Sequence, residues 1–520
     1  MLRYLFLLAA LLALSDTYKI LVVFPFPARS HSILGDGVVD ALAKSNHEVT
    51  HITSFPRKKN VSNIREIDVS ENLKLLPDTM RMIVDSLLNN TSPDIDLSEF
   101  VATTAKILTQ TLENKALQSL VNDPKVQFDV VVVEWFFNEA LSGLSAVFNC
   151  PYIWVSSVDP HWRVLALVDE MPNPAFTPDM MSTYVPPFTF LQRAKELAMQ
   201  AIGLGAQYFI LNNLQRNTYQ NSLAPLIEKR GHKVPPLEAV LYNASLLLSN
   251  SHPSMGRALS LPQNVKAVGG YHIGRSVKPL PDDLKKLLDN SKNGLIYFSL
   301  GSNVKSAYLP DKVKRGLLKM FGALKQTVLW KFEEDMPDIP SNVHIMKWAP
   351  QPSILAHPNC IIFITHGGLL STTEAVHFGK PIIAIPIFGD QYTNTKRAIE
   401  NGYALQVTLT MKLADDLKAA LEEMLSIPTY SIKAKELSVI YHDRPVTPDK
   451  ELVHWVEHVV KTRGAPHLRS PALHVPWYQK LYLDLAAVLL SIIAIIIIGV
   501  KKVISNFRKD KNKTNKKKNQ

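Results

Sequence analysis

The chain has 520 residues, too many for one hydrophobic core, so two domains with additional segments are expected. Hydrophobic residues make up 46% and charged residues 20% of it, as in an ordinary folded protein. Most of the net charge of +11 lies in residues 501–520, where eight lysines and one arginine accompany a single aspartate. The rest of the chain is nearly neutral and has no basic stripe with interleaved aromatic residues, which argues against nucleic-acid binding.

The N-terminus has the pattern of a signal peptide over residues 1–15. Arg3 precedes an apolar run, Tyr4–Leu14, which is too short to cross a bilayer, and Ser15 follows it. The alternative, a buried first strand, is less favoured because a better strand pattern follows at Tyr18–Phe24. The folded part of the chain is therefore predicted to enter a lumen.

One segment, residues 481–500, predicts a transmembrane helix. Its 20 residues, at a rise of about 1.5 Å each, match a hydrocarbon layer of roughly 30 Å, and Asp484 is its only charge. Trp477 and Tyr478 precede it, as interfacial aromatic residues do, and the basic residues 501–520 follow it. The positive-inside rule then predicts a single-pass type I protein with a short basic cytosolic tail.

The last residues favour the endoplasmic reticulum. Lys517 and Lys518 have the placement of the dilysine signal that returns type I proteins to this compartment. The alternative is a generic basic anchor attracted to anionic lipid, and the low-complexity tail is expected to be disordered. The only cysteines, Cys150 and Cys360, are expected to be buried free thiols. Predicted glycosylation acceptors are Asn60, Asn89, Asn90 and Asn243.

The first half alternates strand and helix patterns, which predicts a doubly wound parallel sheet. Phe128–Trp135 is a continuous apolar run, as expected for a parallel strand covered on both faces. Residues 78–122 and 160–230 are predicted helical insertions that either line an apolar pocket or lie on the surface. The other predicted elements are strands at Tyr18–Phe24, 47–55 and Tyr152–Ser156 and helices at about Ile33–Ser45 and Asn138–Phe148.

The second half repeats this alternation after a stretch containing Ser, Pro and Gly, Ser249–Asn264, which is predicted to be the interdomain linker. A helix pattern at Lys450–Lys461 precedes the proline-rich approach to the predicted span. The predicted fold class is therefore α/β, with two doubly wound domains. The predicted strands of this half are Val265–Gly269, Leu295–Leu300, Thr327–Lys331, Val343–Met346, Cys360–Thr365 and Pro381–Pro386.

Small and polar residues follow four of these strands, at the sheet edge where open α/β sheets bind ligands. The most informative stretch, Lys347–Gln391, has His-Gly-Gly between a buried strand and a helix, which suits an anion. A tryptophan held by a proline suits a flat base, and carboxylate and amide groups suit sugar hydroxyls. The pattern predicts a sugar-nucleotide site whose candidates are Ser302, Trp348, Gln351, His366, Gly367, Gly368, Glu374, Asp390 and Gln391.

This stretch resembles the donor-binding motif of the UDP-glycosyltransferase family, membrane-bound enzymes that include glucuronosyltransferases. The resemblance covers essentially the whole chain, from FPFPARSH through GLIYFSLGSN to RPVTPDKELVHWVEHVVKTRGAPHLRSPA. FFNEAL and THGGLLSTTEA resemble insect members more than vertebrate ones. The resemblance implies two facing Rossmann-like domains of the GT-B type, with an acceptor-binding domain over 16–250, a UDP-sugar-binding domain over 251–440, and a returning helix with a pre-membrane segment over 441–480.

Carried over position by position, the resemblance implies a role for each donor-site candidate. Vertebrate members commonly have HGGTNG where this chain has HGGLLS, so a polar side-chain contact from Leu370 is excluded. The implied contacts are Trp348 and Gln351 with the uridine, Ser302, His366, Gly367 and Gly368 with the diphosphate, Glu374 with the ribose, and Asp390 and Gln391 with the sugar.

His31, in Arg-Ser-His after the first strand, matches the family's catalytic histidine. An imidazole titrates near neutrality and can take the proton of an attacking hydroxyl. The alternative is a histidine at a helix start with no catalytic role. A carboxylate is expected to orient the imidazole and stabilise its cation. Glu134 stands where the family usually has Asp, and Glu139 is a competing candidate.

The predicted reaction is an inverting, in-line transfer of a hexose from a UDP-sugar to a hydroxyl of a small lipophilic acceptor, as in detoxification or in conjugation of hormones or pigments. The UDP-sugar is a co-substrate, and neither a metal nor a cofactor is expected. Asp94-Ile-Asp96 formally resembles a metal-binding Asp-x-Asp, but it follows a Ser-Pro break rather than a buried strand. Glucose is favoured over glucuronate by analogy with insect members.

Two other classes of function compete with this prediction. One is a catalytically silent member that binds or sequesters lipophilic molecules. The other, a dinucleotide oxidoreductase, is disfavoured because Gly203-Leu-Gly205 follows a helix-like run and is no dinucleotide fingerprint. The sequence thus predicts an enzyme of the endoplasmic reticulum membrane with lumenal catalytic domains, and it leaves the acceptor and homo-oligomer formation open.

Overall fold

The computed structural model describes residues 17–76, 78–91, 97–256, 259–274 and 277–518. The predicted signal peptide and Asp94-Ile-Asp96 lie outside these described residues. The chain divides into one unit that ends at Arg469 and a second that begins at Ser470. The first unit contains two parallel sheets, and the second contains the apolar C-terminal helix.

Seven parallel strands form the first sheet, in the order β3-β2-β1-β4-β5-β6-β7. All residues of the central strand β4 are buried, which explains its continuous apolar sequence. The bounds are β1 Lys19–Phe24, β2 Glu48–Thr53, β3 Ile64–Asp68, β4 Val130–Trp135, β5 Tyr152–Ser156, β6 Leu246–Ser249 and β7 Val265–Ala267.

Six parallel strands form the second sheet, in the order β10-β9-β8-β11-β12-β13. Its short edge strand β13 has no match among the predicted strands, because three residues carry no periodicity of their own. The bounds are β8 Leu295–Ser299, β9 Thr327–Lys331, β10 Val343–Met346, β11 Cys360–Thr365, β12 Ile382–Ala384 and β13 Ala404–Gln406.

The stretch Ser249–Asn264 is not the interdomain linker that the sequence predicts. It joins β6 to β7, and β7 pairs with β6 through Leu247 opposite Val265 and Ser249 opposite Ala267. The predicted strand Val265–Gly269 therefore extends the first sheet, and the boundary predicted between residues 250 and 251 falls inside that sheet. Tertiary pairing decides which sheet a three-residue edge strand joins, and the local sequence of the strand does not reveal this choice.

Helices cover both faces of each sheet. In β4, Val131 and Val133 enter one hydrophobic cluster while Val130 and Val132 enter another, as the two-residue period of a strand requires. The helices of the first half are α2 Arg29–Lys44, α3 Thr79–Leu88, α4 Leu97–Leu112, α5 Lys115–Asn122, α6 Leu144–Phe148, α7 Trp162–Leu165, α8 Phe190–Ala206, α9 Asn212–Thr218, α10 Ala224–Lys229 and α11 Leu237–Leu241. Those of the second half are α12 Asp282–Asn290, α13 Asp311–Gly322, α14 Gln351–Ala356, α15 Leu369–His377, α16 Gln391–Glu400, α17 Leu413–Ser426, α18 Thr429–His442 and α19 Pro448–Lys461.

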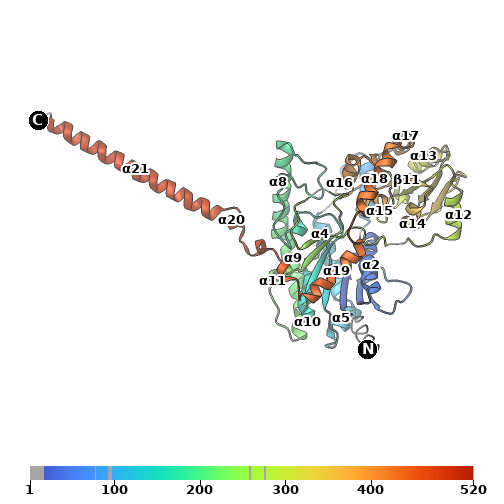
Figure 1. Cartoon of the computed structure of the whole chain (residues 1–520), viewed down its shortest axis with the longest axis horizontal. Helices are drawn as coiled ribbons and strands as arrows, with labels where there is room; N and C mark the ends of the chain where they lie inside the picture. The colour runs from blue at the N-terminus through green and yellow to red at the C-terminus, as the bar shows by residue number, and fades with distance from the viewer. Residues whose placement is uncertain (1–16, 77, 92–96, 257–258, 275–276, 519–520) are drawn as a thin grey trace, which may run out of the picture. The chain divides into compact units, whose positions relative to one another are not determined.

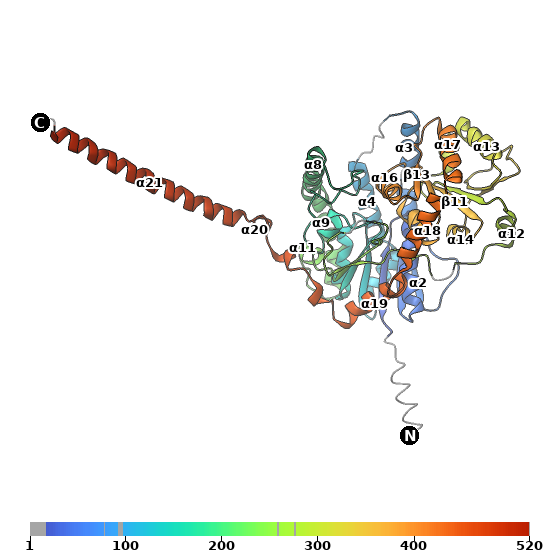
Figure 2. The same ribbon diagram turned by 45° about the horizontal axis from the view of Figure 1, so that its top comes forward.

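Each half of the chain contributes one helix to the hydrophobic core of the other half. The helix α3 belongs to the first half but packs Ile83, Val84 and Leu88 into the second sheet's cluster, on the side of α13 and α17 (Figure 2). The helix α19 returns from the second half and packs Leu452 and Val456 with α2 against the first sheet (Figure 1). This exchange holds the two sheets together within one unit.

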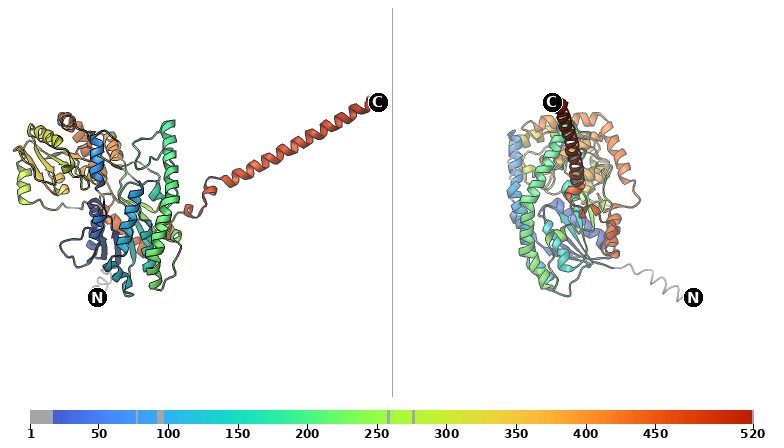
Figure 3. Two further views of the ribbon diagram at one scale, coloured as in Figure 1. Left: turned by 180° about the vertical axis from the view of Figure 1, so that it is seen from behind. Right: turned by 90° about the vertical axis from the view of Figure 1, so that its left-hand side faces the viewer.

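The insertion at 160–230 contains a nearly unbroken helical run, α8 to α10, joined by π turns and drawn green in Figure 3. Its first helix, α8, turns the polar side chains of Glu196 and Gln200 inward. It exposes apolar side chains, among them Phe190, Leu191 and Ile202. The sequence leaves two interpretations of this insertion open, and α8 matches the one in which the helix lies on the surface.

The unit that begins at Ser470 contains α20 (Trp477–Lys480) and α21 (Leu483–Lys518). The part of α21 from Leu483 to Arg508 is long and apolar enough to cross a membrane, with a mean hydropathy of 2.8 over an 18-residue window. The helix does not end with the predicted span but continues to Lys518, through the tail that the sequence predicts to be disordered. Lysine has good helix propensity and no Gly or Pro interrupts residues 501–518, so nothing local stops the helix.

The returning helix α19 gives a test of the helix exchange. Leu452 is fully buried against the first sheet, so Leu452→Ala is expected to lower the free energy of unfolding by about 2 to 5 kcal/mol. The measurement is thermal and denaturant unfolding of the full chain in detergent. Lys450→Ala, an exposed change on the same helix, is the control. An equal loss of unfolding free energy in Leu452→Ala and Lys450→Ala would contradict the packing of α19 against the first sheet.

Acid sensitivity is expected from His161, which follows β5 and packs on Trp135 at 5.1 Å between ring centroids. Burial lowers the pKa of His161 to about 4. Between about pH 6.5 and 4 an unfolded histidine binds a proton while the folded one does not, so stability falls as the pH drops through this window and no further below it. His161→Gln is expected to flatten this part of the stability profile, measured by denaturant unfolding at a series of pH values. An unchanged slope would exclude this contribution.

Candidate functional site

Each sheet has one point where its strand order reverses, between β1 and β4 in the first and between β8 and β11 in the second. Loops leaving the carboxyl ends of such neighbouring strands diverge and open a ligand crevice. His31 follows β1 and Glu134 lies in β4, while Ser302 follows β8 and His366 follows β11. These four candidates therefore lie at the two reversal points, while Trp348 and Gln351 follow the edge strand β10 and Asp390 and Gln391 follow β12.

His31 is joined to Glu134. The helix α2 begins at Arg29, four residues before the predicted start at Ile33, so His31 lies in its first turn. Its Nδ1 lies 2.5 Å from Glu134 Oε1; a carboxylate only accepts, so Nδ1–H donates to it, and in the neutral imidazole Nε2 then carries the lone pair of a base. The hydroxyl of Ser157 donates to the same carboxylate oxygen. Glu134 is fully buried and the His31 side chain is 13% exposed, so the pair is accessible only through the imidazole.

Glu139, the competing carboxylate, lies elsewhere. Its Oε1 accepts a hydrogen bond from Trp135 Nε1 at 3.1 Å, in the short helix η2 (Glu139–Gly143) beyond the end of β4. Burial raises the pKa of Glu139, which favours its neutral acid form. Of the two alternatives that the sequence leaves open, the structure joins Glu134 to the imidazole and buries Glu139 beside Trp135.

Four phenylalanines form an aromatic wall beside the imidazole of His31. The ring centroids of Phe136 and Phe26 lie 4.6 Å and 4.9 Å from the imidazole. Phe100 of α4 lies 6.0 Å from Phe136 and 5.5 Å from Phe137. All four are partly exposed, so they offer apolar surface next to the base. The sequence analysis did not predict this wall, although the Phe-Phe pair directly after β4 was an indication of it.

The imidazole of His366 is held between two glycines. A Cβ at Gly301 would lie 2.5 Å from its Cε1, and a Cβ at Gly368 would lie 2.5 Å from its Nε2, so no side chain fits at either position. Gly367 has φ +79, which favours glycine, and α15 begins directly after Gly368. Burial, and then the charge of Lys331, lower the pKa of His366 to about 4, so its imidazole is neutral near pH 7. The close backbone approach and the helix start suit an anion.

Two cations that sequence reasoning missed lie beside Trp348. Lys331 ends β9, and its Nζ lies 5.7 Å from the indole centroid and 2.7 Å from Glu333 Oε1. The guanidinium of Arg29, from the first half, lies 5.8 Å from the same ring. Trp348 is 52% exposed, so part of the indole is accessible to a ligand. The signal for Lys331 was a charged residue in the last position of a buried strand.

Gln351 and Glu374 are brought together by a hydrogen bond. Gln351 Nε2 donates to Glu374 Oε2 at 2.8 Å and to Ser371 Oγ at 3.2 Å. His272 Nε2 lies 3.5 Å from the other oxygen of Glu374, and both side chains are nearly buried. The carboxylate is thereby oriented before any ligand arrives. Ser302, in contrast, lies partly exposed in the loop after β8.

Asp390 and Gln391 begin α16 at the carboxyl side of β12. Gln391 Oε1 accepts from two backbone N–H groups of its own loop, which leaves its amide N–H groups as the donors for a ligand. Burial raises the pKa of Asp390, while the hydrogen bond from Asn394 and the charge of His31 lower it. His31 of the first half therefore lies within electrostatic reach of Asp390 in the second.

One cluster of possible metal ligands lies among the described residues. Asp36, His51 and Glu66 bring ligand atoms within 4.8 Å of one another. The guanidinium of Arg57 lies among these groups, 3.3 Å from Asp36, 2.6 Å from Asp40 and 3.4 Å from Glu66. The chain itself therefore supplies the cation that balances these carboxylates, and the cluster is an ion-pair network.

Comparison with solved structures agrees with the fold of two parallel sheets. Among solved structures, the calicheamicin glycosyltransferase CalG4 has a TM-score of 0.55 at 16% identity and covers 87% of this chain and 100% of its own. The glycosyltransferase VinC in complex with DTDP has a TM-score of 0.51 at 16% identity and covers 86% of this chain and 99% of its own. These likenesses confirm the predicted GT-B fold.

Sequence relatives cover nearly the full chain. UDP-glycosyltransferase UGT5 of Dactylopius coccus is 33% identical over 96% of this chain and 94% of its own length. UDP-glucosyltransferase 2 of the same organism is 31% identical over 93% and 92%. UDP-glucuronosyltransferase 2B15 of Homo sapiens is 28% identical over 94% and 93%. The profile of one family matches residues 19–518, and the chain belongs to this family, described as "UDP-glucoronosyl and UDP-glucosyl transferase".

Proposed function

We propose that this UDP-glycosyltransferase moves a hexose, preferably glucose, from its UDP-sugar to a hydroxyl of a small lipophilic acceptor, with inversion. The observation that carries the proposal is the His31–Glu134 pair, which presents a basic Nε2 beside an apolar wall and within electrostatic reach of Asp390. The acceptor oxygen attacks the anomeric carbon as its proton passes to His31 Nε2. The bond from that carbon to the UDP oxygen breaks, and UDP leaves with the electron pair.

Glu134 stabilises the imidazolium that forms in this step. Its carboxylate holds the Nδ1–H of His31, so the positive charge on the ring is balanced in a site with little water. Ser157 keeps this carboxylate in place. The arrangement has the logic of a catalytic triad, with the acceptor hydroxyl as the nucleophile.

On the donor side, the chain's own groups hold UDP. In this proposal the indole of Trp348 stacks on uracil, and the ribose meets the carboxylate of Glu374. The diphosphate meets the start of α15, the neutral imidazole of His366 and the cation of Lys331. Developing charge on the leaving UDP is thereby stabilised without a metal or another cofactor.

Asp390 and Gln391 are proposed to hold the sugar by its hydroxyls. Glucose as the preferred donor is supported by the relative named UDP-glucosyltransferase 2, whereas the human relative is named for glucuronosyl transfer. A panel of UDP-glucose, UDP-glucuronate and UDP-galactose, with one phenolic acceptor and detection of released UDP, tests this preference. Faster turnover with UDP-glucuronate would overturn it.

Two features support the proposed acceptor class and location. The aromatic wall beside His31 suits a flat or aliphatic acceptor, as in detoxification or conjugation of hormones or pigments. The apolar part of α21 suits a single span, and the basic residues after it suit the cytosolic side. We propose on this basis that the catalytic domains lie in the lumen of the endoplasmic reticulum, which protease protection in sealed microsomes tests.

Removing the base is expected to abolish transfer. His31→Ala leaves no group to take the acceptor proton, so kcat is expected to fall at least about a hundredfold. The measurement is UDP release from UDP-glucose with a phenolic acceptor, alongside UDP binding by calorimetry as a check of folding. Wild-type turnover in His31→Ala would contradict the assigned base. Acceptor binding without UDP release by the wild type under any donor would instead favour the silent binding protein.

Glu134→Gln and Glu139→Gln are expected to have different effects on the rate of transfer. Glu134→Gln keeps a hydrogen-bond acceptor but removes the charge that balances the imidazolium, so kcat is expected to fall about tenfold or more. Glu139→Gln keeps an acceptor for Trp135 Nε1 at a carboxyl whose pKa burial raises and which does not contact His31, so activity is expected to stay close to wild type. Steady-state rates at saturating donor measure both variants. A larger loss in Glu139→Gln than in Glu134→Gln would reverse the assignment.

A further inference from the structure

The helix α16 faces the donor site at its start and the first half of the chain along one side. Asp390 is its N-cap residue and Gln391 its first residue. Thr393 and Arg397, one turn apart on the same side of the helix, both bond to groups of the first half. Any displacement of this side of α16 therefore moves the two residues proposed to hold the sugar.

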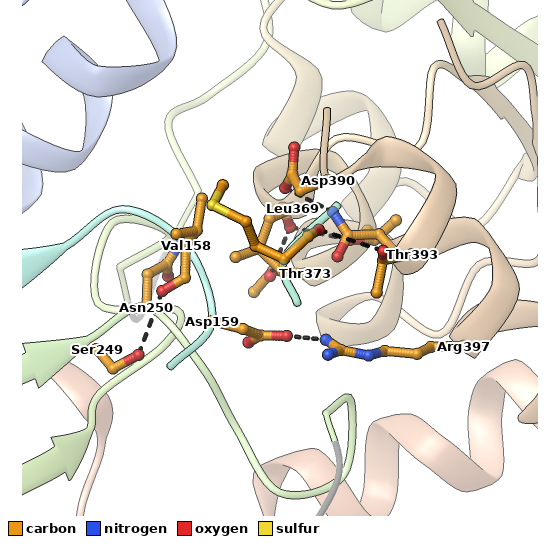
Figure 4. A network of polar contacts seen from close by, with 12 residues as sticks. Val158, Asp159, Ser249, Asn250, Leu369, Thr373, Asp390, Thr393 and Arg397 are labelled. Carbon is orange, nitrogen blue, oxygen red and sulfur yellow. Dashed lines mark hydrogen bonds and ion pairs between the residues drawn. The ribbon is translucent and has the colours of Figure 1, made fainter. Parts of the chain in front are cut away.

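The guanidinium of Arg397 forms an ion pair with the carboxylate of Asp159, shown in Figure 4. Their side chains are only 15% and 18% exposed, so water screens the pair weakly. Burial lowers the pKa of Arg397 and the charge of Glu400 raises it, but a guanidinium stays protonated in either case. This is a close and poorly solvated charge pair between the two halves.

Asp159 is carried by a loop that also serves the proposed catalytic pair. Ser157, two residues earlier, donates to Glu134. Between them, the carbonyl of Val158 accepts hydrogen bonds from Ser156 Oγ at 2.9 Å and from Ser249 Oγ at 3.3 Å. The loop after β5 is thus fixed at one end to the carboxylate beside His31 and at the other to α16.

A second contact holds the first turns of α16. Thr393 Oγ1 donates to the carbonyl of Ser182 at 2.6 Å, with the carbonyl of Met180 at 3.3 Å. This stretch of the first half is itself tied to α8, because Glu196 accepts from the Asp179 N–H at 2.9 Å and from the Ser182 hydroxyl. The buried side chain of Glu196 on α8 therefore supports the loop that meets α16.

Within α16 the link to the sugar-binding residues is direct. Asn394 follows Thr393, and its Nδ2 donates to Asp390 Oδ2 at 2.8 Å (Figure 4). We propose that Asp159 and Arg397 are positioning residues that lock α16 to the first half and so aim Asp390 and Gln391 at the donor sugar. This inference rests on the proposed role of those two residues. It makes sugar recognition a property of both halves, although Asp390 and Gln391 belong to the second.

The test measures recognition of the donor sugar separately from binding of the nucleotide. In the full-length protein, Asp159→Asn and Arg397→Gln are each expected to lower kcat/KM for UDP-glucose at least tenfold. The Kd of UDP alone is expected to stay within about twofold of wild type, because Trp348, Glu374 and His366 lie outside α16. Joining Asp159→Arg with Arg397→Asp re-forms an ion pair and is expected to recover part of the loss.

Arg216→Gln is the matched control, because it breaks an Arg–Glu pair that lies exposed on the first half. Unchanged kinetics in Asp159→Asn and Arg397→Gln would overturn the inference while leaving the proposed transfer intact. An equal loss of UDP affinity and UDP-glucose affinity would also overturn it, since the pair would then support the fold and not the sugar residues. Wild-type activity in His31→Ala is a separate result and bears on the proposed function alone.

Discussion

The buried carboxylate of Glu134 is the constraint on which the site depends. A charged group with no exposure in the centre of a sheet is unfavourable unless hydrogen-bond donors meet it. His31 and Ser157 are those donors. Both donors follow strands next to β4: α2 begins at Arg29, a short loop after β1, and Ser157 directly follows β5. The same loop continues to Asp159 and meets the second half, so one buried charge organises both the proposed base and the contact between the halves.

The two halves are interlocked rather than simply adjacent. The helices α3 and α19 each complete the hydrophobic core of the opposite sheet. Leu370, at the start of α15 in the proposed donor site, packs against the first sheet's cluster as well. The leucine that replaces a polar residue of the vertebrate motif thus has a packing role.

The proposed donor site depends on backbone approach more than on charge. Glycines on both sides of His366 leave room for the imidazole and for a ligand close to the helix start. The imidazole is neutral near pH 7, so Lys331 is the full positive charge beside it. This division explains why the sequence pattern is dominated by Gly and His rather than by arginines.

The sequence by itself determined the two doubly wound domains, the strand ends that carry the donor-site candidates, and a span near the C-terminus, because these follow from local periodicity and from residues adjacent in the chain. It did not reveal that β7 extends the first sheet or that α3 joins the second core, since those outcomes depend on long-range packing. Only the tertiary structure joined His31 to Glu134 rather than Glu139, brought Lys331 beside Trp348, and paired Asp159 with Arg397. The partners in these pairs are separated by 17 to 238 positions in the chain, and no local pattern records which distant side chains a fold brings into contact.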